Sequence, residues 1–200
     1  YGSSWHGLVN PHSGRMFSNQ AVTADATSLN CSTSNSWLDN LWSSMYRTIE
    51  QSNIIIANME NSNLANKDVV LGQAYLIRGI VYFDLVRLFG GVPIKNDPTS
   101  LENMNKPKSS KAEVYDLIFS DLDKAKSLLP ENHSNYRLDR PLKWAACGYK
   151  AKAYMQLAGE DGGNPSYWQN AYNEAILVYS KYSLHANYGD MFLSTGWVEN

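Results

Sequence analysis

The stretch from Gly72 to Ile94, GQAYLIRGIVYFDLVRLFGGVPI, decides the fold of this chain. Its apolar residues recur every three or four positions, which is the period of one face of an α-helix. Gly90 or Gly91 is suited to the left-handed conformation that ends many helices, and Pro93 prevents the helix from resuming. The stretch therefore predicts a long amphipathic helix over residues 66–89.

One broad apolar stripe is expected to face the core from this helix. Gly79 interrupts the helix at a cost of roughly 1 kcal/mol against Ala, and close approach of a second helix is the simplest reason to tolerate it. The stripe consists of Val70, Leu71, Ala74, Ile77, Arg78, Val81, Leu85 and Leu88.

Four more helices follow from the same period. Ser36 is the expected N-cap of the first, and Ser110 with Glu113 forms a capping box, in which each side chain binds the other residue's backbone N–H. Pro141 suits a first helical turn, and Gly159 is expected to close the helix that it opens. The predicted helices cover residues 36 to about 61–63, 66–89, 110–129, 141–158 and 166–180. The last is expected to bury Trp168, Ala171, Ala175, Ile176 and Tyr179.

The fold class predicted from this pattern is all-α. The helices begin at intervals of roughly 25–45 residues, near the ~34-residue period of tetratricopeptide (TPR) repeats. We expect TPR-like antiparallel helix pairs with long irregular loops. Residues 1–200 are interpreted as one helical domain and a piece of a longer protein, with a loop-rich segment over 1–35 and a helical repeat region over 36–192.

Composition excludes several classes of function. Charged residues make up 18% of the chain and the net charge is −2, so nothing favours binding to nucleic acid or an anionic membrane surface. No uninterrupted apolar run reaches ~20 residues, which argues against a membrane-spanning helix. The densest basic group, Lys106, Lys108 and Lys111, is interpreted as a solvated loop. The chain begins at Tyr1 without a signal peptide, so we expect a processed or trimmed fragment.

Catalytic and metal-binding motifs are not recognised. The four histidines are scattered, and Asp121 and Asp123 are two apart on a helix, so they face different sides and do not form a carboxylate pair. No cofactor or metal site is predicted; the turn at residues 160–164 is interpreted as solvated rather than cation-binding. Cys31 and Cys147 leave two interpretations open: a buried thiol at Cys147, or a disulfide between them in an oxidising compartment.

Three segments carry a family resemblance. The first is Trp42-x-x-Met-Tyr-Arg-x-Ile-x-x-x-Asn53, and the second is Arg78-Gly-x-x-Tyr-Phe-Asp-Leu-Val-Arg-Leu-Phe-Gly-x-Val-Pro93. The third is Glu113-Val-Tyr-x-x-Ile-x-x-Asp-Leu-x-x-Ala-x-x-x-Leu-Pro130, and an alanine-rich helix over 142–157 comes after it. In this order they resemble the SusD/RagB family over residues 36–192. The family usually has Ala at the position of Gly79 and a polar residue at that of Gly91.

The resemblance implies a glycan-binding function without catalysis. Members of this family are surface lipoproteins of the outer membrane that capture oligosaccharide for a TonB-dependent β-barrel transporter, which their TPR-like helices dock. By this resemblance we expect an oligosaccharide ligand, a TonB-dependent transporter as partner, and a lipid anchor outside this chain as the only membrane attachment. Family members are also much longer than 200 residues, and their C-terminal portion supplies part of the ligand surface.

The resemblance also directs attention to the loops ahead of the first long helix, which contribute to the family's glycan site. Trp37 is the first candidate, because helix phasing does not force its ring inward and an indole face can stack on a pyranose. The alternative is that Trp37 only packs against the helix start. Trp5 is a second stacking candidate. Arg15, Asp39 and Asn40 are expected to bond ring hydroxyls. By contrast, Arg78, Asp84 and Arg87 are expected to hold helices together, and Trp42 and Tyr46 to lie in the core.

Two other functions are weighed. A helical-repeat scaffold that binds a peptide or protein would show a concave groove lined by Asn and Lys, whereas a glycan site would show exposed Trp residues at a loop-built pocket. An enzyme such as a glycosidase is the least favoured, because the sequence carries none of the motifs that such chemistry needs.

Overall fold

The computed structural model describes residues 28, 30, 32–133, 137–184 and 186–189. In this part of the chain the regular structure is helical and no strand is assigned, which confirms the all-α prediction. The helices are α3 (Ser36–Glu60), α4 (Lys67–Phe89), α5 (Lys111–Leu128), α6 (Lys143–Glu160) and α7 (Pro165–Tyr179). The chain divides into two compact units, Tyr1–Ala146 and Cys147–Asn200, and each is described by itself.

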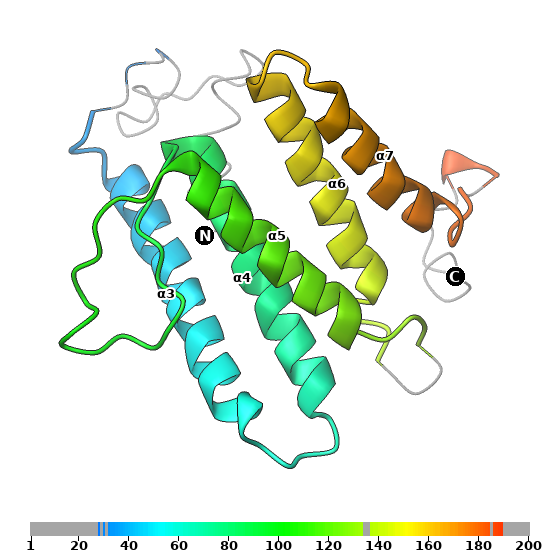
Figure 1. Cartoon of the computed structure of the whole chain (residues 1–200), viewed down its shortest axis with the longest axis horizontal. Coiled ribbons are helices and arrows are strands. Elements are labelled where there is room, and N and C mark those ends of the chain that lie inside the picture. Colours follow the sequence, from blue (N-terminus) through cyan, green and yellow to red (C-terminus); the bar gives the residue numbers. More distant parts are fainter. Residues whose placement is uncertain (1–27, 29, 31, 134–136, 185, 190–200) are drawn as a thin grey trace. The chain divides into compact units, whose positions relative to one another are not determined.

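In the first unit α4 lies between α3 and α5 and packs against both. The three helices alternate in direction (Figure 1). A short turn over residues 61–66 joins α3 to α4, so these two form an antiparallel pair. The connection from α4 to α5, over residues 90–110, is much longer and lies beside α3 (Figure 1).

Because α4 has a helix on either side, it buries most of its circumference. Tyr75, Phe83 and Val86 are all less than 5% exposed, whereas Ile77 and Leu88, which the sequence placed in the core stripe, are 45% and 38% exposed. The prediction of a single apolar stripe was therefore wrong at these positions. One-sided patterning describes a helix that covers a core, and α4 is instead the centre of one.

The composition of α4 also resembles that of a membrane-spanning helix. By length and hydropathy it is sufficient to cross a bilayer, so the sequence-based argument against such a segment fails for α4. However, 72% of its most apolar window is buried inside the protein. Burial, rather than composition, identifies α4 as a core helix.

Small residues let α4 and α5 approach closely, as Gly79 predicted. A Cβ atom at Gly79 would lie 3.3 Å from the Cγ of Leu122 on α5. At Gly72 it would lie 2.9 Å from the Cγ of Leu129, a distance that real Cβ contacts do not reach. The two glycines thus set the separation of the two helices.

The helix starts follow capping rules, with one correction. The predicted capping box of α5 is present: the Ser110 N–H donates to Glu113 Oε2 at 2.8 Å and the Glu113 N–H donates to Ser110 Oγ at 3.2 Å. The N-cap of α3 is Asn35, not Ser36 as predicted. Its Oδ1 accepts from the N–H groups of Trp37 and Leu38, and an Asn carboxamide caps as well as a Ser hydroxyl does.

Glycine ends α4 at Gly90, one of the two expected positions, but the end of α6 differs from the prediction. Gly90 ends α4 with φ 73° and ψ −138°, a positive-φ conformation other than the left-handed helical one. Gly159 lies inside α6, and Gly162 and Gly163, with φ 63° and 90°, follow that helix instead. Pro141 precedes α6, which begins at Lys143.

The second unit contains the paired remainder of α6 and α7. Lys150 Nζ and Glu174 Oε1 lie 3.2 Å apart, and the rings of Tyr154 and Tyr167 stack at 6.4 Å. Cys147 is a buried thiol. Cys31 lies outside the described residues, so the alternative, a disulfide between the two cysteines, is not tested. In the turn after α6, the Asn164 amide donates to the Asp161 carboxylate at 2.7 Å.

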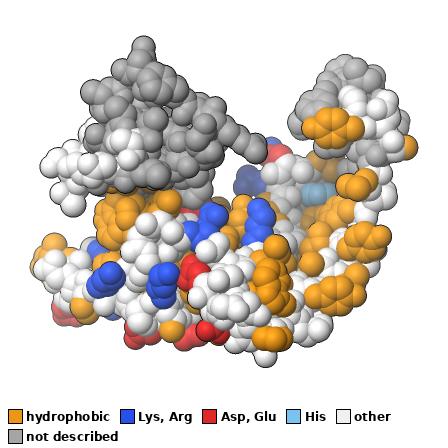
Figure 2. Space-filling view, turned by 90° about the horizontal axis from the view of Figure 1, so that it is seen from above, with side chains coloured by type: hydrophobic (Ala, Val, Ile, Leu, Met, Phe, Trp, Pro, Cys, Tyr) orange, Lys and Arg blue, Asp and Glu red, His pale blue; other side chains and the backbone are white. Residues whose placement is uncertain are grey.

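The inward face of α7 differs from the predicted one. Ala171 is buried as expected, but Trp168, Ile176 and Tyr179 are 45%, 40% and 79% exposed. Hydrophobic side chains are accordingly visible at the surface (Figure 2). The buried or half-buried positions of α7 are Tyr167, Asn170, Ala171, Glu174 and Val178. Both sets have helical spacing, and the side chains that meet α6 decide between them.

Candidate functional site

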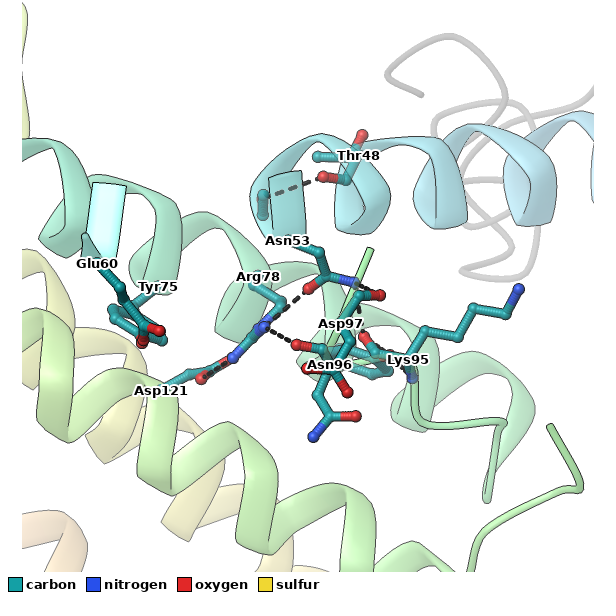
Figure 3. Close-up of polar contacts among 11 residues, drawn as sticks. Thr48, Asn53, Glu60, Tyr75, Arg78, Lys95, Asn96, Asp97 and Asp121 are labelled. Carbon is teal, nitrogen blue, oxygen red and sulfur yellow. Dashed lines mark hydrogen bonds and ion pairs between the residues drawn. The ribbon is translucent and has the colours of Figure 1, made fainter. Parts of the chain in front are cut away.

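A buried polar network joins the three helices of the first unit (Figure 3). The Arg78 guanidinium on α4 donates two hydrogen bonds to Asp121 on α5, at 2.7 and 2.8 Å. It also donates to Asn53 Oδ1 on α3 at 2.7 Å and to the carbonyl of Asn96 at 3.1 Å. The network therefore holds α3, α4, α5 and the start of the long connection together.

The charges in this network are almost fully buried. Burial raises the pKa of the Asp121 carboxyl, and the ion pair with Arg78 opposes that effect. Burial acts to lower the pKa of Arg78, but its bonds to Asp121 outweigh this and raise the pKa. Asp123, two residues on, is exposed, which confirms that the two aspartates face different sides. Because its partners satisfy Arg78, the expected structural role of this residue is confirmed.

A pocket of ≈ 320 Å³ lies beside the network, but several of its polar groups bind one another. The Tyr75 hydroxyl donates to Glu60 at 2.8 Å, and Lys124 Nζ lies 4.6 Å from the centre of the Tyr75 ring. Burial and the Glu60 bond raise the pKa of Tyr75 to about 12. This pocket is therefore a weaker candidate for a ligand than the cleft described next.

The cleft lies between the first half of α3 and the connection from α4 to α5, and its volume is ≈ 550 Å³. The residues that line it combine aromatic, small polar and basic side chains. They are Trp42, Ser43, Tyr46, Arg47, Pro93, Lys95, Met104, Asn105 and Lys106. We define these nine residues as the α3 cleft.

The aromatic wall of the α3 cleft is fixed by packing and a hydrogen bond. Trp42 contacts Phe89 edge-on at 5.0 Å and lies 4.8 Å from Tyr46, measured between ring centres. The Tyr46 hydroxyl donates to the carbonyl of Pro93 at 2.8 Å, and burial raises the pKa of this phenol. Both rings are only half-buried, so the prediction that they lie in the core is wrong in part. They form the edge of the core and reach the cleft.

Hydrogen bonds also fix the opposite wall, which belongs to the connection. The Lys95 N–H donates to the Tyr82 hydroxyl at 2.7 Å, and the Lys95 carbonyl accepts from Asn53 at 3.1 Å. Further along, Glu50 on α3 accepts from the Thr99 N–H and hydroxyl at 2.9 and 2.7 Å. The connection is irregular in shape but is tied to α3 and α4 at several points.

The sequence-predicted site residues lie near this cleft or outside the described part of the chain. Asp39 and Asn40 are exposed in the first turns of α3, four and three positions before Ser43, so they are its neighbours on the helix surface. Trp37, two residues before Asp39, is half-buried. None of these three is among the described lining residues. Trp5 and Arg15 lie outside the described residues, and all five assignments stay predictions.

Sequence reasoning missed the cleft residues themselves. Trp42 and Tyr46 have core spacing, so periodicity assigned them to packing. Lys106 was interpreted as part of a solvated loop; it is exposed, but it also lines the cleft. The sequence signal that could have indicated the cleft was Arg47, because this charged residue directly follows the aromatic Tyr46 on the amphipathic first helix.

Comparisons of this chain with known protein families, sequences and structures find similar proteins. Residues 6–155 match the model of the SusD-like_3 family, described as "Starch-binding associating with outer membrane". Two Formosa agariphila proteins, SusD-like protein P38 and SusD-like protein P25, are 29% and 28% identical over 76% and 87% of this chain. A crystal structure determined with xylogluco-oligosaccharide superposes with a TM-score of 0.80 at 26% identity over 94% of this chain.

These similarities cover only part of each relative. The chain spans 29% of P38, 32% of P25 and 40% of the protein in the crystal structure. The matched part includes α3, α4, α5 and most of α6.

Proposed function

Because the chain belongs to the SusD-like family of starch-binding, outer-membrane-associated proteins, we propose that it captures oligosaccharides without covalent chemistry and that the α3 cleft contributes to the ligand site. One observation carries the proposal. The cleft places aromatic rings beside hydrogen-bonding side chains. A sugar ring presents the complementary surface, with apolar C–H faces and hydroxyl groups at its edge.

Each wall of the α3 cleft has a distinct part in this proposal. Trp42 and Tyr46 supply apolar surface that loses water when a sugar covers it. Ser43 and Asn105 both donate and accept hydrogen bonds, as a hydroxyl does. Asp39, Asn40 and Trp37, in the adjacent turns of α3, extend the contact surface for a chain of several sugar units. The volume of ≈ 550 Å³ lies within the range of small-molecule sites.

We further propose the setting in which capture occurs. The protein would be a surface-exposed lipoprotein of the outer membrane and would pass its glycan to a TonB-dependent β-barrel transporter. The family description, which joins starch binding with the outer membrane, supports this setting.

The test is calorimetric titration of residues 1–200 with a panel of soluble oligosaccharides, including starch-derived and xyloglucan-derived ones. The titrations are repeated with Trp37→Ala, Asn105→Ala and Leu101→Ala. Asn105 lines the cleft, whereas Leu101 is 89% exposed on the same connection and is not a lining residue. We expect saturable binding to one glycan class, weakened by Asn105→Ala and unchanged by Leu101→Ala.

The other outcomes have separate meanings. Binding that survives Asn105→Ala but is lost in Trp37→Ala would move the site to the first turn of α3. No binding to any glycan would contradict capture by this chain and favour the alternative, a helical-repeat scaffold for a peptide or protein. Two observations favour that alternative: Lys95, Asn105 and Lys106 line the α3 cleft, and α7 exposes apolar residues such as Trp168 and Tyr172.

A further inference from the structure

The α3 cleft is lined by three cationic residues. Arg47 lies on α3, and Lys95 and Lys106 lie on the connection that faces it; the described lining residues include no Asp or Glu. The excess is local, because the whole chain has 19 acidic and 17 basic residues. The positive charge of the cleft is thus a property of its geometry and not of the overall composition.

Neighbouring acidic groups in the described part of the chain direct their side chains to other partners or are exposed. Glu50, one turn after Arg47, uses both carboxylate oxygens to bind Thr99. Asp84 pairs with Arg87 on α4, and Asp97 lines the pocket around Arg78 rather than the α3 cleft. Asp39 is exposed one turn before the cleft. Among the described residues, no ion pair engages Arg47, Lys95 or Lys106.

The backbone that carries one of these cations is held in place. Lys95 has hydrogen bonds at both its N–H and its carbonyl, which involve Tyr82 and Asn53. Its side chain extends away from the Arg78 network (Figure 3). Since the backbone is already fixed, less conformational freedom is lost when an anion binds there.

Neutral sugars use such cations poorly. Lys and Arg only donate hydrogen bonds, and their strongest bonds are to charged oxygens. We propose that the α3 cleft prefers oligosaccharides with anionic groups, either a uronate carboxylate or a sulfate ester, bound by Arg47, Lys95 and Lys106 while Trp42 and Tyr46 contact the ring. This inference rests on the proposed function and specifies its class of ligand.

The experiment compares three probes on residues 1–200: an oligogalacturonate, a sulfated carrageenan oligosaccharide, and a neutral galactan oligosaccharide of similar length. Titrations are run at low and high NaCl concentration. We expect one or both anionic probes to bind at least about tenfold more tightly than the neutral one, since a hydrogen bond to a charged group contributes this much. Added salt should weaken only anionic binding. The preferred anionic probe distinguishes carboxylate from sulfate.

Three charge-neutralising variants locate the effect. Arg47→Gln and Lys106→Gln remove cations of the cleft, and Lys108→Gln removes one from the same connection that does not line it. All three residues are exposed, so folding should be unaffected, and circular dichroism checks this. We expect Arg47→Gln and Lys106→Gln each to weaken anionic binding about tenfold, and by more than they weaken neutral binding. Lys108→Gln should change neither.

The proposal would be overturned by equal binding of neutral and anionic probes, or by equal losses in Lys106→Gln and Lys108→Gln. In either case glycan capture would still stand. Failure of all three probes, together with the starch and xyloglucan panel, would contradict the proposed function itself.

Discussion

Arg78 and Asp121 place two opposite charges where water is almost completely absent, with side chains 4% and 1% exposed. Removing one partner of such a pair leaves the other charge buried and uncompensated, which costs more than the pair contributes. When Arg78 is the partner removed, the cost is higher still, because Asn53 and the Asn96 carbonyl lose their hydrogen-bond donor as well.

The Asp121→Asn variant tests this role. We expect a loss of about 3–5 kcal/mol in the free energy of unfolding, measured by urea denaturation, because the Arg78 charge stays buried. Asp116→Asn, at an exposed position of the same helix, is the control and should change stability by less than about 0.5 kcal/mol. A double variant, Arg78→Met with Asp121→Leu, should be less destabilised than Asp121→Asn; equal loss would indicate that packing and not charge dominates.

Gly91 and Gly148 differ in the space around them, and the stability of alanine variants measures this difference. A Cβ at Gly91 would lie 2.1 Å from the Ser109 carbonyl oxygen, where backbone has to move, whereas one at Gly148 in α6 meets nothing within 4 Å. We expect Gly91→Ala to lower the melting temperature. Gly148→Ala should raise stability by up to about 1 kcal/mol through helix propensity. A neutral Gly91→Ala would contradict the close approach of residues 91 and 109.

At the scale of the element, α5 depends on its capping box. Ser110→Ala removes the acceptor for the Glu113 N–H, and we expect a loss of about 1 kcal/mol in unfolding experiments. Ser120→Ala, at an exposed position of the same helix, should have little effect and serves as the control. If both variants lose the same stability, the cap is not the cause.

The capping box also predicts a pH effect. Hydrogen bonds from the Ser110 N–H and hydroxyl lower the pKa of Glu113 below its ordinary 4.5. Since the folded pKa is the lower one, the stabilisation from this carboxylate is present above about pH 4.5 and is lost as pH falls through the folded value. An NMR titration of the Glu113 carboxyl should show the lowered pKa, and Ser110→Ala should return it toward 4.5.

At the scale of the whole molecule, the proposed function is capture without chemistry. We expect an oligosaccharide incubated with the protein to be recovered at unchanged length, as measured by mass spectrometry, even at protein concentrations that saturate binding. A glycosidase added to a parallel sample provides the positive control for cleavage. Time-dependent shortening by the purified protein would contradict the proposal, provided that it is also lost on heat inactivation.

The sequence by itself determined most of the elements, because helix period and capping act over a few neighbouring residues. The helices at 36–60, 67–89 and 111–128, the capping box, the role of Gly79 and the motif order that identifies the family are all local signals. The sequence did not predict the buried face correctly where more than one face of a helix is apolar. On α4 this is because helices enclose it on both sides, and on α7 because helical spacing suits both the predicted and the observed set of buried residues.

Only the tertiary structure decided how the α3 cleft is assembled. Arg47 and Lys106 are far apart in sequence and come together because the connection after α4 is tied back to α3 through Asn53 and Glu50. Whether Trp42 and Tyr46 are core or surface depends on the same connection, since burial is set by what packs over a ring. Periodicity identifies the face of a helix, but the distant segment that meets this face determines whether it becomes core or binding site.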